Sequence, residues 1–283
     1  VVLRIFNRDN LVMELANLGF EQAQLELVQR MLMSPYGINL ITGQIASGKT
    51  TLLYSMLNAL NTSERNIMTL EDPVEFRMAN IRQMQVAESV DFTFARGMRA
   101  AVRQDPDVIM LGEIRDNETA QSAFQAALTG TLVFSTFHTF DVSGLVIRLI
   151  EMGIPRSVVA HALTGVVSTR LVRKVCEQCR AEVPAGELEQ HFLGAAVAGI
   201  QFMAGQGCEE CRQTGYRGRV GIYEVVMLDD DIRVAIIEER DAGTLKSLVQ
   251  DKLSLPLHEA ALNKVRAGVT TVAELVRVIG SRW

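Results

Sequence analysis

The chain has 283 residues, of which 48% are hydrophobic and 22% are charged, and its net charge is −5 at pH 7. This composition is typical of a globular protein with one large domain or a core with appendages. No apolar run approaches the roughly 18–20 residues that a membrane span needs, so we expect the chain to lie outside the bilayer. The acidic balance counts against nucleic acid as a direct partner, because sequence-independent binding depends on neutralising phosphates.

The first residues read VVLRIF, a strand-like pattern. Because the chain begins with Val-Val rather than Met, we interpret residues 1–10 as the remnant of an N-terminal domain. A linker and helix are expected over residues 11–33, where apolar side chains recur at helical spacing and Pro35 ends the pattern.

Short apolar runs then alternate with helical patterns. The expected strands cover residues 39–42, 67–70, 108–111 and 132–134, and the expected helices cover residues 50–60, 93–104 and 117–129. Continuous apolar strands separated by helices are typical of a parallel sheet that is buried on both faces. The sequence therefore predicts an α/β core over residues 34–172.

A phosphate-binding loop follows the first of these strands. Residues Gly43 to Thr50 read G-Q-I-A-S-G-K-T, which matches the pattern G-x-x-x-x-G-K-[ST], and a helix is expected directly after them. Backbone N–H groups and the helix N-terminus would bind phosphates, and the lysine would add a positive charge. The threonine hydroxyl would bind Mg²⁺. The expected nucleotide-binding residues are Gly43, Ser47, Gly48, Lys49, Thr50 and Thr51.

Carboxylates and an imidazole follow three of the other strands. The segment EDPVE (71–75), Glu113 and His138 each come just after an apolar run. Because ligands gather at the carboxyl ends of parallel strands, we expect these groups beside the phosphate-binding loop. Glu113 is the candidate for the Mg²⁺ and water shell, whereas Asp107 lies at the opposite end of its strand.

Three arginines share one face of the helix expected over residues 93–104. Arg96, Arg99 and Arg103 are spaced at i, i+3 and i+7, and like charges at this spacing disfavour one another. A solvated face is one interpretation, especially for Arg96. For Arg99 and Arg103, an anionic target such as a γ-phosphate or a neighbouring subunit is the stronger interpretation.

The four cysteines form two C-x-x-C pairs, Cys176/Cys179 and Cys208/Cys211. Pairs with this spacing are typical of a closed tetrahedral Zn²⁺ site that has a structural role. Redox pairs and two separate disulfides are the alternatives. We assign residues 173–222 to a metal-binding, zinc-knuckle subdomain, in which the glycine-rich stretch 214–221 is expected to form a hairpin before a strand at 222–226.

Residues 223–283 are expected to contain a strand and a helical C-terminal subdomain. Thr271 and Glu274 have the spacing of a capping box, in which each side chain bonds the backbone of the other residue. This places the start of the last helix after Thr271.

Several motifs together resemble the type II secretion and type IV pilus-assembly ATPases. They are the phosphate-binding loop, EDPVEF (71–76), RQDPDVIMLGEIRD (103–116), TGTLVFSTFHT (129–139), and CEQC followed by CEECRQTGYRGRVGIYE within 176–224. The resemblance covers nearly the whole chain. It implies a RecA-like core and a homo-hexameric ring that hydrolyses ATP to polymerise pilin-like subunits. It also implies a cytoplasmic location, peripheral at the inner membrane of a bacterium and reached only through platform and adaptor proteins.

The resemblance also assigns roles by position. Residues 43–50 resemble the Walker A loop, with Lys49 offsetting charge, and residues 71–75 resemble the Asp box. Glu75 or Glu113 would position the attacking water, and His138 resembles the His box. Arg99 and Arg103 look like an arginine pair, Arg4 looks like an arginine directed at the nucleotide, and the four cysteines look like the family's zinc site.

The sequence departs from this family at three places. Gln44-Ile45-Ala46 replaces the usual Pro-Thr-Gly, Thr131 stands where most relatives have His, and Phe140 stands where they have Asn. Ala46 tolerates a positive φ less well than glycine does. We expect nucleotide binding to survive these changes.

Two other functions stay open at this point. A RecA-like nucleic-acid translocase also combines such a core with zinc knuckles, and a weakly catalytic regulatory subunit would fit the altered loop. With only residues 1–10 of an N-terminal domain, we expect the chain by itself to hydrolyse ATP slowly and to form hexamers poorly.

Overall fold

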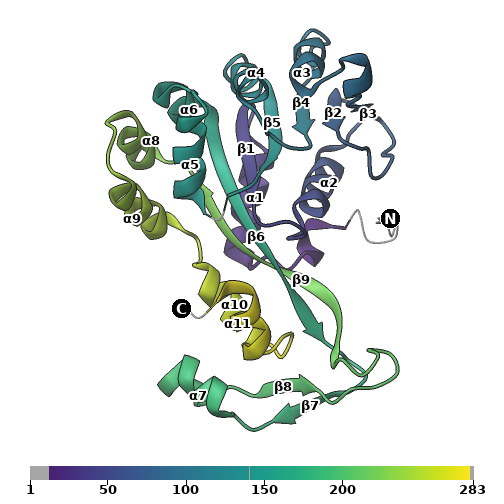
Figure 1. Ribbon diagram of the computed structural model, residues 1–283, viewed down its shortest axis with the longest axis vertical. Coiled ribbons are helices and arrows are strands. Elements are labelled where there is room, and N and C mark those ends of the chain that lie inside the picture. Colours follow the sequence, from purple (N-terminus) through teal and green to yellow (C-terminus); the bar gives the residue numbers. More distant parts are fainter. Residues whose placement is uncertain (1–12, 140, 281–283) are drawn as a thin grey trace.

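The computed structural model describes residues 13–139 and 141–280. Arg4 and Phe140 lie outside the described residues. The centre of the molecule is a seven-stranded sheet with the order β3-β2-β4-β5-β1-β6-β9 (Figure 1). Its strands are β1 Gly37–Thr42, β2 Ile67–Glu71, β3 Ile81–Gln85, β4 Val108–Leu111, β5 Leu132–Phe137, β6 Leu163–Val175 and β9 Tyr216–Met227.

Neighbouring strands of this sheet are parallel, except for the antiparallel pair β6 and β9. Every residue of β1, β2, β4 and β5 is buried, which explains why these strands read as continuous apolar runs. The predicted α/β fold with a parallel-rich sheet is confirmed.

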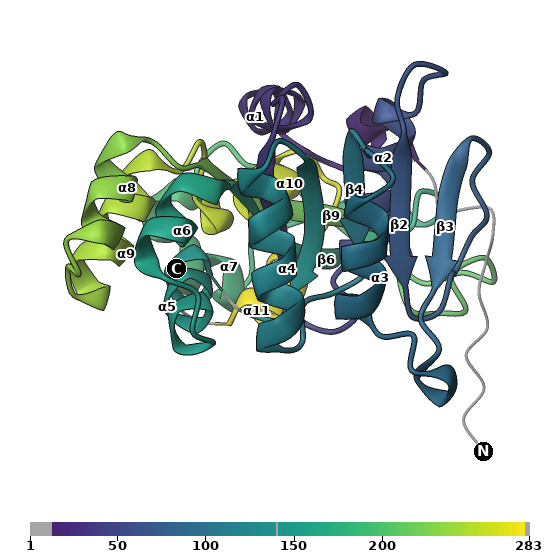
Figure 2. The same ribbon diagram turned by 90° about the horizontal axis from the view of Figure 1, so that it is seen from above.

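Helices cover both faces of the sheet (Figure 2). The helices α1 and α2 pack on one face, and α3 to α6 pack on the other. Their bounds are α1 Gln22–Leu32, α2 Lys49–Leu60, α3 Phe94–Val102, α4 Asn117–Leu128, α5 Val142–Glu151 and α6 Arg156–Ala162. Short 3₁₀ turns occur at Leu15–Asn17, Glu88–Val90 and Gly194–Val197.

The strands β6 and β9 are long, and their far ends extend beyond the rest of the sheet (Figure 1). They carry the cysteines and a small layer made of β7 Arg180–Val183, α7 Glu187–Leu193 and β8 Phe202–Gly205. Strand β6 crosses residue 173 and β9 crosses residue 222, so the main sheet is continuous with the metal-binding subdomain that we proposed over 173–222.

The glycine-rich stretch 214–221 differs from expectation. The strand begins at Tyr216, six residues earlier than predicted, because β6 continues far enough to pair Val175 with Tyr216. The turn comes before the strand, where Arg212, Gln213 and Gly215 all have positive φ.

Four helices complete the C-terminal part: α8 Asp230–Ile237, α9 Ala242–Lys252, α10 Leu257–Arg266 and α11 Val272–Ile279. The first two extend the main core, whereas α10 and α11 form a separate apolar cluster with β6 and β9. Within the described ranges, no helix combines the length and the apolar character needed to cross a bilayer.

The carboxylate of Glu274 ties α11 to β6. Thr271 caps the helix as predicted, accepting a hydrogen bond from the Glu274 N–H (3.2 Å), but the reciprocal half of the capping box does not form. The Glu274 side chain turns instead to the guanidinium groups of Arg173 (2.7 Å) and Arg277 (2.7 Å). Burial acts to raise the pKa of Glu274, but these hydrogen bonds outweigh it and lower the pKa to about 2.

We expect Glu274→Gln to lower the free energy of unfolding at pH 7 by about 2 kcal/mol, because a neutral amide loses the attraction of two half-exposed arginines. The depressed pKa stabilises the fold above the ordinary value of 4.5, and this contribution is lost as pH falls from there toward 2. Urea unfolding of both proteins between pH 7 and pH 3 measures it.

The matched control is Glu151→Gln, which removes the exposed i,i+3 pair with Arg148 and should change stability by less than about 0.5 kcal/mol. A Glu274→Gln effect that is no larger than the control, or that is the same at pH 3 and pH 7, contradicts the prediction.

Candidate nucleotide and metal sites

The loop between β1 and α2 is shaped by two glycines. Gly43 (φ 151°) and Gly48 (φ 94°) both have positive φ. A Cβ atom on Gly43 would lie 2.5 Å from Ser47 Oγ and 2.6 Å from the carbonyl oxygen of Thr169, so only glycine fits there. Because α2 begins at Lys49, the loop places the N-terminus of a 12-residue helix beside the pocket.

Two polar groups in this loop suit a phosphate. Lys49 Nζ donates hydrogen bonds to the carbonyl oxygens of Gly43 and Gln44, both at 2.8 Å. Burial lowers the pKa of Lys49, although Glu113 acts to raise it. Ser47 Oγ is buried and has no hydrogen-bond partner among the described residues. A bound phosphate would give the ammonium a charged partner and would also lie within the reach of this unsatisfied hydroxyl.

The pocket next to the loop has a volume of about 410 Å³, within the usual range for small-molecule and cofactor sites. The loop following β1 forms one side, and the ends of β2, β4 and β5 contribute carboxylates and an imidazole. The residues proposed from sequence that line it are Ser47, Gly48, Lys49, Thr50, Thr51, Glu75, Glu113 and His138. The structure thus brings together the groups that the sequence placed at strand ends.

Glu113 is held by two positively chargeable groups. One carboxylate oxygen pairs with Arg115, and the other lies 3.1 Å from His138 Nε2. Arg115 also reaches Asp72 at 3.4 Å, so the ends of β2, β4 and β5 are linked. Burial acts to raise the pKa of Glu113, but Arg115 and then His138 outweigh it, and the pKa lies below its ordinary value.

Two arginines of the pocket were missed by sequence reasoning. Arg115 lies two residues beyond Glu113, so its position after a strand was a usable signal. Arg219 belongs to the glycine-rich stretch and lines the pocket together with Leu171. No local signal marks Arg219, because it reaches the pocket only through the pairing of β9 with β6.

The predicted arginine pair, Arg99 and Arg103, lies away from the pocket lining described above. Arg99 forms an ion pair with Glu118 (2.6 Å), Arg96 pairs with Asp91 (2.6 Å), and neither Arg99 nor Arg103 lines the pocket within the described part of the chain. A role for Arg99 and Arg103 in nucleotide binding therefore stays a prediction, and Arg4 lies outside the described residues.

Two further positions lie at the N-terminal ends of their strands, opposite the ends that form the pocket. Asp107 lies just before β4 begins, as predicted. Its carboxylate accepts a hydrogen bond from the backbone N–H of Asn66 (2.6 Å). Thr131, one of the departures from the family pattern, is buried just before β5 begins. That departure is therefore remote from the pocket, whereas Ala46 lines it.

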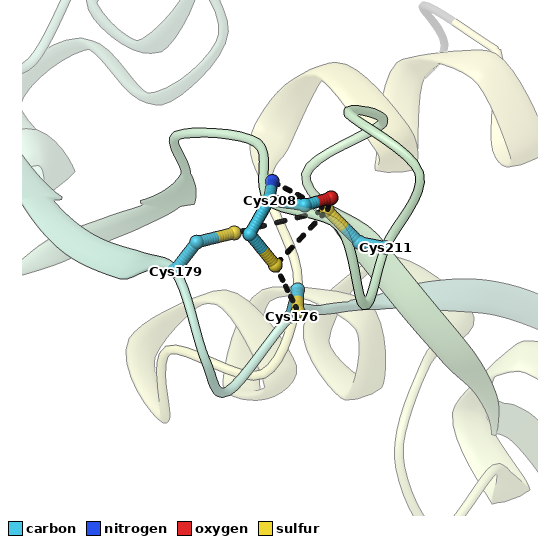
Figure 3. Close-up of side chains that lie close together, drawn as sticks. All are labelled: Cys176, Cys179, Cys208 and Cys211. Atoms are coloured by element: carbon cyan, nitrogen blue, oxygen red, sulfur yellow. Dashed lines mark hydrogen bonds between the residues drawn. The ribbon is translucent and has the colours of Figure 1, made fainter.

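The four cysteine sulfurs converge between the ends of β6 and β9 (Figure 3). All lie within 4.8 Å of one another, and the separations Cys176–Cys208, Cys179–Cys211 and Cys208–Cys211 are 3.8, 3.9 and 3.7 Å. Four thiolates around Zn²⁺ at about 2.3 Å lie about 3.8 Å apart at the corners of a tetrahedron. The cysteines are free thiols rather than disulfides, and their arrangement is compatible with zinc.

Two backbone N–H groups donate hydrogen bonds to the sulfur of Cys211 and stabilise its thiolate form. Cys211 Sγ accepts hydrogen bonds from the N–H groups of Cys208 (3.2 Å) and Gly215 (3.3 Å). Burial acts to raise the pKa of Cys211, but these bonds outweigh it and lower the pKa to about 6. The thiolate, which is the form that binds metals, is therefore favoured at this position.

The fold and the pocket together define a P-loop nucleotide-binding protein of the α/β class. Comparison with known proteins narrows this class. The chain belongs to the family described as Type II/IV secretion system protein, whose model matches residues 1–277.

Relatives of known role share much of its sequence. The chain is 44% identical over 278 residues to the type II secretion system protein E of Pectobacterium carotovorum subsp. carotovorum, covering 98% of this chain and 55% of that protein. It is 42% identical over 278 residues to the type IV pilus assembly ATPase PilB of Thermus thermophilus, covering 97% of this chain and 31% of that protein. The chain thus spans about half the length of the first of these relatives and about a third of the second.

Solved structures agree with this assignment. The crystal structure of the pilus retraction motor PilT with bound ADP is 28% identical with a TM-score of 0.69, covering 94% of this chain and 66% of that one. The ATPase DotB of Legionella pneumophila is 25% identical with a TM-score of 0.68, covering 94% of this chain and 65% of that one.

The altered phosphate-binding loop carries backbone strain at Ala46, whose φ is 61°. Because an L-residue in this region is disfavoured and glycine is not, we expect Ala46→Gly to raise the free energy of unfolding by about 0.5–1 kcal/mol. Urea denaturation of the two proteins measures it.

Ala100→Gly within α3 is the control for the same chemical change in ordinary helical backbone, and it should cost about 1 kcal/mol. If Ala46→Gly destabilises the chain as Ala100→Gly does, the backbone at Ala46 is not strained.

Proposed function

We propose that this chain is the ATPase portion of a motor that hydrolyses ATP to drive assembly of pilin-like subunits, in type II secretion or in extension of a type IV pilus. The observation that carries the proposal is the pocket that joins Lys49 to Glu75 and Glu113 from separate strand ends. The names of relatives that are 42–44% identical support the same activity.

Binding of ATP uses groups that already face the pocket. The N-terminus of α2 and the backbone N–H groups of the loop hold the phosphates, and Lys49 exchanges two carbonyl partners for a phosphate oxygen. The residues that would hold Mg²⁺ are Thr50, through its hydroxyl, and Glu113. When bound, this ion offsets the charge on the β- and γ-phosphates.

Glu75 is the better candidate for the general base. Arg115 and His138 contact the carboxylate of Glu113 and hold its pKa below the ordinary value, which makes Glu113 a weaker base. A carboxylate held in this way suits the Mg²⁺ and water shell better than proton abstraction. Glu75 accepts a proton from the attacking water while the oxygen of that water bonds to the γ-phosphorus. The bond between the γ-phosphorus and the oxygen that bridges the β- and γ-phosphates breaks, and ADP is released.

The remaining assignments concern assembly. We propose that the protein acts as a homo-hexamer, in which Arg99 and Arg103 meet a phosphate or a neighbouring subunit and Arg4 approaches the nucleotide. Arg99 would give up its exposed partner Glu118, at a cost of less than about 1 kcal/mol. Platform and adaptor proteins would bring the hexamer to the cytoplasmic face of the inner membrane, with no direct part for nucleic acid.

We also propose that Cys176, Cys179, Cys208 and Cys211 bind one structural Zn²⁺. Four thiolates leave no open coordination position, which suits folding rather than catalysis. The layer formed by β7, α7 and β8 has few buried apolar residues, since only Leu193 and Phe202 of these elements belong to a core cluster, so a metal would add much of its order.

Lys49→Ala should abolish ATP hydrolysis, because the methyl group can offset no charge on the phosphates. We expect phosphate release to fall at least 100-fold in a steady-state assay, with the fold preserved by circular dichroism. Lys174→Ala, which removes a lysine outside the pocket lining, is the control. Turnover of Lys49→Ala within twofold of the wild type would rule out the proposed phosphate site.

Protein purified without added zinc should contain about one Zn²⁺ per chain by elemental analysis. The Cys208→Ser protein should contain no zinc and should have a lower melting temperature, because the two C-x-x-C pairs are then no longer joined by the metal. Lys49→Ala should retain its zinc, which separates the metal site from the nucleotide site. A metal-free wild type with four titratable thiols would refute the assignment.

A further inference from the structure

Tyr54 connects the phosphate-binding helix to the loop that carries Glu75. It lies on α2, five residues beyond Lys49, and its side chain is fully buried. Its hydroxyl donates to a carboxylate oxygen of Glu71 and accepts from the backbone N–H groups of Glu75 (3.3 Å) and Phe76 (3.4 Å). One donor and two acceptor positions are thereby used, which is the full capacity of the hydroxyl.

The direction of these bonds is fixed by chemistry. Backbone N–H groups can only donate, so the hydroxyl proton must point to Glu71. Burial, and then the hydrogen bond and charge of Glu71, raise the pKa of Tyr54 above its ordinary value. The phenol therefore keeps the proton that this arrangement needs.

Glu71 in turn is held by neighbours on the same edge of the sheet. Its other carboxylate oxygen accepts hydrogen bonds from Thr69 Oγ1 (2.5 Å) and Gln83 Nε2 (3.0 Å). Gln83 also donates to the carbonyl of Phe76 (2.8 Å) and accepts from the N–H of Met78 (2.8 Å). Side chains, rather than a neighbouring strand, thus fix the backbone around Glu75.

We propose that Tyr54 is a positioning residue that couples the phosphate-binding helix to Glu75. The inference rests on the proposed function, in which Glu75 is the base. Lys49 and Thr50 occupy the first turn of the same helix, so the helix that binds phosphate also holds the backbone N–H of Glu75. A displacement of about 1 Å at a catalytic group can lower the rate about 100-fold. Loss of this single hydroxyl can therefore slow ATP hydrolysis by letting Glu75 move.

Tyr54→Phe tests the proposal because it keeps the ring and removes only the hydroxyl. We expect kcat for ATP hydrolysis to fall at least tenfold, with KM for ATP and Kd for ADP within threefold of the wild type. Tyr223→Phe is the matched control. Its hydroxyl is also buried, but it donates to the carbonyl of Leu18 (3.2 Å), which lies outside the loop that carries Glu75. This control should lose stability while keeping kcat within twofold.

A double-mutant cycle shows whether Tyr54 acts through Glu75. In a Glu75→Gln background, Tyr54→Phe should lower the residual rate by less than twofold, since the group that it positions has gone. A further tenfold fall in that background, or a Tyr54→Phe enzyme with kcat like that of Tyr223→Phe, overturns the proposal.

Hydrogen exchange gives a readout that does not depend on turnover. The N–H groups of Glu75 and Phe76 should exchange at least tenfold faster in Tyr54→Phe than in the wild type, and Tyr223→Phe should leave them unchanged. Equal exchange in all three proteins overturns the coupling even if rates differ. A wild type that hydrolyses no ATP overturns the proposed function and the role of Glu75 in it, while the exchange rates still decide whether Tyr54 holds the loop.

Discussion

The position of β1 between two parallel neighbours determines the rest of this structure. Strands β5 and β6 flank it, so its backbone is paired on both sides and its end is fixed in the middle of the sheet. The chain continues from that end into the phosphate-binding loop, whose path requires glycine at Gly43 and Gly48. Helix α2 then packs on the same face of the sheet as α1. Because β2, β4 and β5 run in the same direction, their polar ends must meet at the same edge.

This constraint explains which features could be predicted from the sequence. The apolar runs at β1, β2, β4 and β5 marked the strands, and their parallel direction then placed Glu75, Glu113 and His138 beside Lys49 before any contact was known. The cysteine spacing in the same way predicted four converging sulfurs. The common direction of the strands carried the first prediction, and residue spacing alone carried the second.

Other features depended on long-range pairing and had no local signal. Arg219 lines the pocket because β9 pairs with β6, where Arg173 lies opposite Arg219 and 46 residues earlier in the chain. The glycines around Arg219 suggested a hairpin instead. No local signal marks Tyr54, because its hydroxyl gains its partners only when Glu71 and the loop beyond it are placed in the fold. Glu274 fitted a capping box, but a sequence cannot show that Arg173, about 100 residues away, competes for the same carboxylate.

The ribbon formed by β6 and β9 brings the sulfur cluster close to the pocket. Leu171 and Arg219 form part of the pocket wall, and Cys176 follows Leu171 by only five residues, about 16 Å along an extended strand. The two-stranded ribbon therefore lines the pocket at Leu171 and Arg219 and carries the sulfur cluster at its end, a few residues further along the same strands. A metal held by the four sulfurs would therefore join the ends of β6 and β9 close to the pocket wall, although no cysteine is among the described residues that line the pocket.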